Sequence, residues 1–172
     1  AEALDQLVHF VRALGIGGTA VGTGINAEPQ YPALMVKHLR EITGLELEVG
    51  EDRVQLMQSM GDIASFSGAL RAWVLDLNKI ANDIRLLASG PRTGLAEIGL
   101  PAVQPGSSIM PGKVNPSIAE MVNQVCYQAL GLDVTVAMAA EAGQLELNVM
   151  MPVMTHNIVF ALMIVGNATR VF

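Results

Sequence analysis

An apolar stripe with a repeating three- and four-residue spacing is the feature that most restricts the fold of this chain. No proline lies between residues 51 and 90, so we expect one unbroken helix there, about 55–60 Å long at 1.5 Å per residue. A period of 3.5 residues favours nearly parallel neighbours in a left-handed bundle. The sequence therefore predicts an all-α, long-helix bundle that is oligomeric, because one short chain cannot surround this helix. The stripe consists of Leu56, Ile63, Phe66, Leu70, Trp73, Leu77, Ile80, Ile84 and Leu87.

Glycine and proline divide the rest of the chain into further predicted elements. A helical pattern over 4–14 ends at Gly15 and is followed by a glycine-rich turn at 17–24. The segment from Ser89 to about 116 is rich in glycine and proline, which predicts a long loop. We expect one domain over 1–172. The other expected helices run from about 32 to 43, from about 116 to 131 and on toward 140, and from about 152 to the end.

The composition leaves more apolar surface than one such domain can bury. Hydrophobic residues make up 51% and charged residues 15%, whereas about 25% charged is usual for a soluble domain. The uncharged run at 147–169 has the length of a membrane span. It is interrupted by Asn148, Pro152 and His156, and its purely apolar part, 158–165, is too short. We therefore expect a buried or subunit-facing helix and no membrane.

Charge and cysteine usage restrict partners and location. The formal net charge is −6 and basic runs are lacking, which argues against nucleic acid as a partner. Cys126 is the only cysteine, so no internal disulfide can form, and its apolar neighbours predict a buried thiol in a reducing, cytoplasmic setting. The histidines at 9, 38 and 156 lack metal-ligand spacing. We expect no metal and no cofactor.

The loop at 106–116 has the composition of an anion-binding site. It reads Gly-Ser-Ser-Ile-Met-Pro-Gly-Lys-Val-Asn-Pro, so hydroxyls, a lysine and an amide stand between glycines and prolines. Glycines let backbone N–H groups turn toward an anion, and the next helix adds its positive end. A nucleotide-binding P-loop is excluded, because five residues separate Gly106 from Gly112 and Val114 follows Lys113. On the residues alone, a flexible linker remains the alternative.

Three segments resemble the aspartase/fumarase superfamily of lyases. The loop matches its signature Gly-Ser-Ser-x-Met-Pro-x-Lys-x-Asn-Pro at every specified position. The second match is Gly-Thr-Ala-Val-Gly-Thr-Gly at 18–24, and the third covers 67–70 and 79–87. The resemblance follows the whole chain in order and corresponds to the middle of a full member. It implies the central helical domain of that fold, with a catalytic loop at 105–116.

The resemblance also implies the chemistry and its residues. Members remove a proton next to one carboxylate of a four-carbon dicarboxylate, pass through an aci-carboxylate and release fumarate by anti-elimination. Carried over by motif position, Ser107 is the expected base. Ser108 is expected to bind the carboxylate that takes up the charge, and Lys113 and Asn115 the other carboxylate. Glu120 matches a glutamate that pairs with a histidine of another subunit.

Two family segments are absent from this chain. The histidine belongs to a Gly-x-Thr-His-x-Gln-Asp-Ala motif that does not occur here, and the first Ser-, Thr- and Asn-rich segment is also missing. Since the family builds each site from three subunits of a homotetramer, we expect the isolated chain to be inactive. Residues 139–150 and 122–126 resemble aspartases more than fumarases, which implies ammonia elimination from L-aspartate. Fumarate hydration is the alternative, and a helical oligomerisation module is the alternative for the fragment alone.

Overall fold

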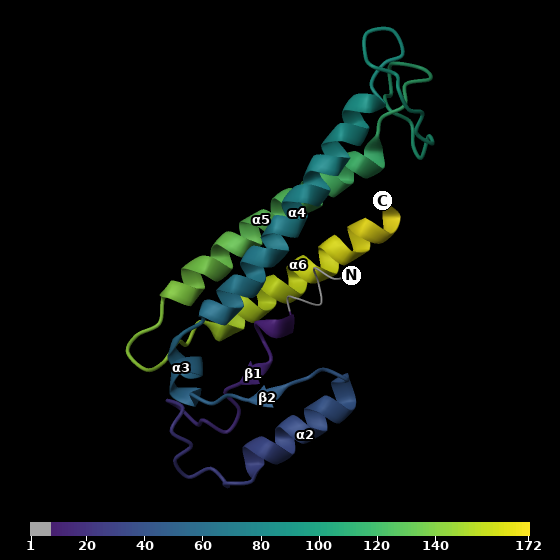
Figure 1. Cartoon of the computed structure of the whole chain (residues 1–172). Helices are drawn as coiled ribbons and strands as arrows, with labels where there is room; N and C mark the ends of the chain where they lie inside the picture. Colours follow the sequence, from purple (N-terminus) through teal and green to yellow (C-terminus); the bar gives the residue numbers. More distant parts are fainter. Residues whose placement is uncertain (1–7) are drawn as a thin grey trace. The chain divides into compact units, whose positions relative to one another are not determined.

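The structure is a computed structural model and describes residues 8–172. It confirms the all-α class, with one minimal sheet in which β1 and β2 pair in parallel, Ala13 opposite Glu48 and Leu14 opposite Val49 (Figure 1). The elements are, in chain order, β1 (Ala13–Leu14), α2 (Tyr31–Thr43), β2 (Glu48–Val49), α3 (Arg53–Gln58), α4 (Gly61–Leu87), α5 (Ser117–Glu141) and α6 (Met151–Val171).

The chain forms two compact units. Unit 1 contains residues up to Leu70 and Asp133–Ile158, and unit 2 contains Arg71–Leu132 and Val159–Phe172. Helices α4, α5 and α6 each contribute residues to both units. Whether 1–172 acts as one domain stays a prediction.

The N-terminal part of unit 1 corrects one expected helix. Of the pattern over 4–14, Leu4 and Leu7 lie outside the described residues, residues 8–9 are helical as expected, and Ala13–Leu14 is a strand. The strand forms because β2 supplies backbone partners: the Glu48 N–H donates to Arg12 O at 2.9 Å, and the Gly50 N–H donates to Leu14 O at 3.0 Å. A helical pattern this short is overridden when a strand partner lies nearby.

The glycine-rich turn at 17–24 is packed against the start of α3. Gly22 has a φ of +90°, and a Cβ there would lie 2.4 Å from the carbonyl oxygen of Arg53. Only glycine fits this contact. The helix expected at 32–43 is confirmed as α2, with Pro32 in its first turn and Gly44 as a left-handed cap that donates to Arg40 O at 2.9 Å.

The long helix expected across 51–90 is broken. Helix α3 ends at Gln58, Ser59 is extended at φ −97° and ψ 121°, and α4 begins at Gly61. The break has a tertiary cause, because the Asn148 N–H donates to Met57 O at 2.9 Å and Met60 is buried. With 27 residues, α4 is about 40 Å long.

Unit 1 has an apolar core. Met60, Val136, Ala139 and Met154 form a buried cluster from the residue before α4, the C-terminal part of α5 and the start of α6. Asn148 closes the C-terminus of α5, since its Nδ2 donates to Ala139 O at 2.9 Å and to Ala140 O at 3.1 Å. The helix end is thus supplied with the donors it needs.

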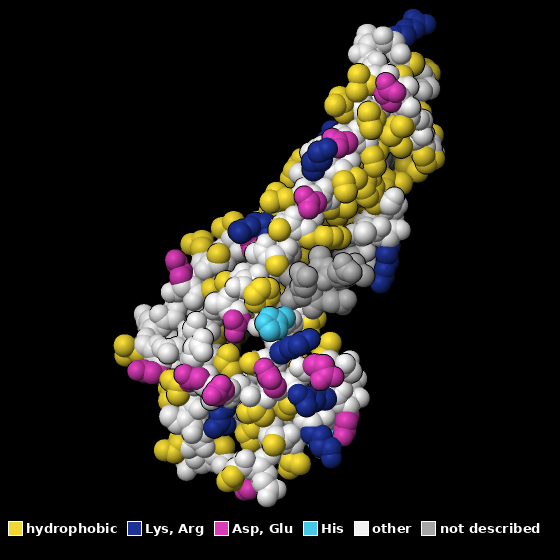
Figure 2. Space-filling model, viewed as in Figure 1, with side chains coloured by type: hydrophobic (Ala, Val, Ile, Leu, Met, Phe, Trp, Pro, Cys, Tyr) yellow, Lys and Arg dark blue, Asp and Glu magenta, His cyan; other side chains and the backbone are white. Residues whose placement is uncertain are grey.

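Only one side of the heptad stripe is buried. Leu70 and Leu77 are buried, but Ile80 is 49% exposed and Trp73 is half-buried. Val74 and Ala81, which lie outside the stripe on the same helix, are buried instead. Figure 2 shows hydrophobic side chains along much of the face formed by α4 and α5. Exposed apolar side chains on these two helices include Leu75, Ile80, Leu86, Tyr127, Val134 and Met138.

Helices α5 and α6 agree with expectation. Helix α5 runs without interruption through Gly131, and α6 begins at Met151. Cys126 is buried as expected, and burial raises the pKa of its thiol. Among the described residues, α6 is one helix with the length and apolar composition of a membrane span. The absence of a membrane therefore stays a prediction.

Candidate active site

The segment between α4 and α5 forms the expected long loop, with no helix or strand over residues 88–116. Its first part folds back on the end of α4: the Ala96 N–H donates to Ser89 O at 2.6 Å and the Glu97 N–H to Leu87 O at 2.9 Å. All contacts of the loop described below lie within unit 2.

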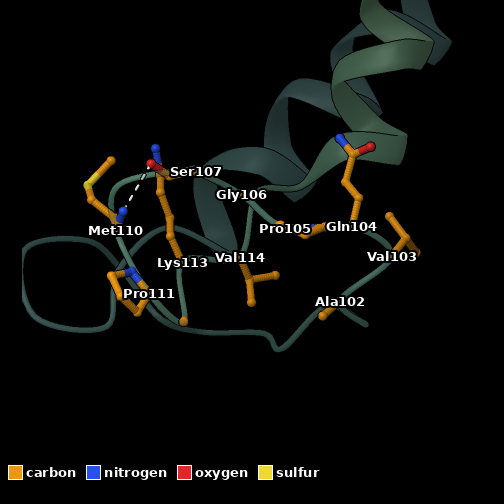
Figure 3. A pocket seen from close by; sticks show the side chains of 11 residues that line it. Ala102, Val103, Gln104, Pro105, Gly106, Ser107, Met110, Pro111, Lys113 and Val114 are labelled. Atoms are coloured by element: carbon orange, nitrogen blue, oxygen red, sulfur yellow. Dashed lines mark hydrogen bonds between the residues drawn. The ribbon is translucent and has the colours of Figure 1, made fainter.

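Ser107 lies in a tight turn that presents backbone donors to its side chain. The N–H groups of Ile109 and Met110 both donate to Ser107 Oγ, each at 3.2 Å. Figure 3 shows the bond from Met110 as a dashed line. Two N–H dipoles directed at one oxygen favour negative charge on that oxygen. The turn is therefore chemically suited to a serine that works as an oxyanion.

Gly106 closes the loop into a ring. Its N–H donates to Lys113 O at 3.0 Å, and its carbonyl accepts from Asn115 Nδ2 at 3.0 Å. A Cβ at Gly106 would lie 2.6 Å from Lys113 O, so a side chain would force the ring apart. Ring closure brings Ser107, Lys113 and Asn115 into one short structure.

A hollow of about 500 Å³ adjoins this ring, and Lys113 is the only charged residue among those that line it (Figure 3). The side chain of Lys113 is exposed and takes part in no ion pair within residues 8–172. In the view of Figure 3 it extends in the direction of Ser107. An ammonium without an ion-pair partner that lines the same hollow as Ser107 and Met110 favours the binding of an anion there.

The other two expected site residues lie apart from this ring. Ser108 is exposed, and Glu120 is half-buried in the first turn of α5. Within the described part of the chain, no hydrogen bond or ion pair joins either side chain to Ser107, Lys113 or Asn115. The loop thus assembles three of the five expected residues.

A buried polar cluster near the start of α5 was not predicted from the sequence. Asn123 is 2% exposed, and its Oδ1 accepts from Arg85 Nη1 at 3.0 Å. Its Nδ2 donates to Asn78 Oδ1 at 2.7 Å and to Asn78 O at 3.2 Å. The sequence signal was an asparagine between Val122 and Cys126, inside a buried apolar run. We call Asn78, Arg85 and Asn123 the Asn123 cluster.

Metal-ligating side chains do not gather in the described residues: no group of three or more His, Cys, Asp or Glu is placed to hold an ion over 8–172. His38 is paired on the surface with Glu41, with 3.1 Å between Nδ1 and Oε2.

Comparison with known proteins gives closely related sequences. A family model described as a lyase matches residues 1–131. Aspartate ammonia-lyase of Bacillus subtilis is 52% identical over 171 residues, which cover 99% of this chain and 36% of that protein. Aspartate ammonia-lyase of Helicobacter pylori is 50% identical over 160 residues, which cover 93% of this chain and 34% of that protein.

Solved structures give the same picture. A fumarate lyase:delta crystallin protein from Brucella melitensis matches with a TM-score of 0.90 at 51% identity, over 97% of this chain and 36% of that one. A class II fumarase from Schistosoma mansoni matches with a TM-score of 0.90 at 34% identity, over 98% of this chain and 38% of that one.

The matches extend along nearly all of this chain, although it spans only about a third of the length of the relatives, 36% and 34% for the first two. The family model covers most of the chain, including the loop at 106–116. The chain therefore belongs to the aspartase/fumarase superfamily of lyases.

Proposed function

We propose that the protein containing this chain eliminates ammonia from L-aspartate and releases fumarate. The observation that carries the proposal is the pair of N–H groups on Ser107 Oγ next to a hollow in which Lys113 is the only charged residue among those lining it. The names of the relatives that are about 50% identical support the choice of substrate.

Ser107 acts as the base in this proposal. Its Oγ, as an oxyanion held by the N–H groups of Ile109 and Met110, takes a proton from the carbon next to one carboxylate. The electron pair of the broken C–H bond moves into that carboxylate, which becomes an aci-carboxylate bound by Ser108. The double bond then forms as the C–N bond breaks, and ammonia leaves from the opposite face.

Lys113 and Asn115 hold the second carboxylate. The ammonium of Lys113 supplies the charge. Asn115 already donates one N–H to Gly106 O, but an amide nitrogen carries two N–H groups. The remaining N–H is available to the substrate while the first one keeps the loop closed.

The remaining parts of the site come from elsewhere in the intact protein. Glu120 pairs with a histidine of another subunit, and the segments that this chain lacks complete the pocket. A homotetramer supplies them, and its contacts cover exposed apolar side chains such as Ile80 and Met138. In this proposal the isolated chain is inactive. The enzyme is cytoplasmic and binds neither membrane nor nucleic acid.

Fumarate hydration is the second candidate. The class II fumarase of Schistosoma mansoni matches this chain with a TM-score of 0.90, the same as the fumarate lyase:delta crystallin protein from Brucella melitensis. Its sequence identity is lower, at 34% against 51%. The base and the aci-carboxylate are the same in both reactions, and only the leaving group differs.

The deciding experiment incubates the intact protein with L-aspartate and separately with L-malate and follows fumarate absorbance. Fumarate from aspartate alone supports the proposal. Fumarate from malate alone replaces it with the second candidate and leaves the role of Ser107 in place. The isolated 172-residue chain is assayed in parallel, and turnover by that chain without another polypeptide would refute the shared-site part of the proposal.

A further inference from the structure

The Asn123 cluster uses every hydrogen-bonding group of one buried amide to join α5 to α4 within unit 2. Asn78 and Arg85 are seven residues apart on α4, so they lie two turns apart on one face. Asn123 bonds to both, at 2.7 Å and 3.0 Å. Hydrogen bonds weaken steeply beyond about 3.5 Å, so a rotation or slide of α5 by one residue would break them. The cluster therefore fixes both the rotation and the register of this part of α5.

The cluster is a poor way to gain stability. Arg85 Nε is buried and has no hydrogen-bond partner in the described part of the chain. A buried donor without an acceptor costs free energy, and replacing both partners of a buried polar contact by apolar side chains of similar shape can be nearly neutral. The flanking buried residues Val122 and Cys126 show that apolar packing is available here. A different role, that of fixing geometry, is consistent with these observations.

The geometry that the cluster fixes includes the catalytic loop. Glu120 lies one turn before Asn123 on α5, so the rotation of the helix determines its direction. The start of α5 is bonded to the loop, since the Ser117 N–H donates to Asn115 O at 2.8 Å. Asn115 in turn donates to Gly106 O at 3.0 Å, directly before Ser107.

We infer that Asn123 is a positioning residue that holds Glu120 and the Ser107 loop in working geometry through its bonds to Asn78 and Arg85. The activity readout of this inference rests on the proposed function. This buried polar contact of unit 2 then serves the reaction more than the stability of the fold.

The test compares three forms of the intact protein. The first is wild type, and the second carries Asn123→Leu with Arg85→Met, which removes both sides of the main contact together. The third, Ser67→Ala, is the matched control. Ser67 Oγ donates to Asp133 Oδ1 at 2.6 Å, a buried polar contact that also joins α4 to α5 but lies in unit 1. Thermal unfolding, kcat, KM and amide hydrogen exchange of peptides covering 106–120 are measured for each.

We expect the double variant to unfold near the wild-type temperature, with kcat lowered about 100-fold and KM near that of wild type, because misplaced groups slow the chemical step. Amide hydrogen exchange of peptides covering 106–120 should rise.

The control, Ser67→Ala, should unfold at a lower temperature with unchanged kcat. A double variant with wild-type kcat would overturn the inference, and so would one whose activity falls only with its folded fraction. If wild type releases no fumarate from either substrate, the proposed function fails, and unchanged exchange over 106–120 would separately overturn the positioning role.

Discussion

The two units join the same pair of helices, α4 and α5, by different means. In unit 1 the contact includes the apolar cluster of Met60, Val136, Ala139 and Met154, together with the buried hydrogen bond from Ser67 Oγ to Asp133 Oδ1. In unit 2 it includes the Asn123 cluster, which leads directly to the loop of Ser107. Apolar packing is non-directional, whereas hydrogen bonds fix orientation. Because the polar contact of unit 2 leads to the candidate loop and that of unit 1 does not, we predict that unit 1 mainly supplies stability and unit 2 mainly supplies the geometry of the candidate site.

The largest expected effect is on activity and comes from unit 2. Replacing Ser107 by Ala removes the proposed base, and kcat of the intact protein should fall about 10³-fold, within the usual range for loss of a general base. Because Ser107 is only partly buried in a loop, the unfolding temperature should stay near wild type. Steady-state kinetics and thermal unfolding check both statements. Retained turnover would remove Ser107 from the mechanism.

The second effect is on stability and comes from unit 1. Met154 is 1% exposed, so Met154→Ala should lower the free energy of unfolding by about 2–5 kcal/mol. Urea unfolding gives this value, and kcat per folded molecule should not change. Met163→Ala on the exposed side of the same helix is the control. A fall in kcat of folded Met154→Ala would break the proposed division between the units.

A smaller effect tests whether water is excluded from the interior of unit 2 around Cys126. Burial raises the pKa of the Cys126 thiol above its ordinary value of 9.0. The neutral thiol is therefore favoured in the folded state, and its contribution to stability is complete below pH 9 and is lost as pH rises through the folded pKa. The free energy of unfolding of wild type should fall more steeply above pH 9 than that of Cys126→Ala. Equal slopes would mean that water reaches the thiol.

The smallest effect concerns the surface of unit 2. Lys79 and Asp83 form an exposed ion pair one turn apart on α4. Lys79→Gln should change the free energy of unfolding by about 0.2–0.5 kcal/mol, and less in high salt. Chemical unfolding at low and high ionic strength measures this change. A loss of several kcal/mol would show that unit 2 depends on its surface charges.

Much of the local structure of the candidate loop was predictable because its residues are neighbours in the sequence. Ser107, Lys113 and Asn115 lie in one glycine- and proline-rich segment, so the ring that joins them is a local structure. The direction of Glu120 and the role of Asn123 were not predictable. Both depend on Asn78 and Arg85, which are 45 and 38 residues away from Asn123 along the chain.

The sequence by itself determined the helical class, the bounds of α2 and α6, and the loop between α4 and α5. Periodicity, Gly44 and Pro152 act locally, so these features can be read without knowing the fold. Only the tertiary structure decided that Ala13–Leu14 is a strand, that the helix breaks at Ser59, and which side of the heptad stripe is buried. Each of these depends on a partner distant in sequence: β2 for the strand, Asn148 for the break, and α5 for the buried side. Local preferences amount to only tenths of a kcal/mol per residue, whereas such tertiary contacts are worth about 1 kcal/mol or more each.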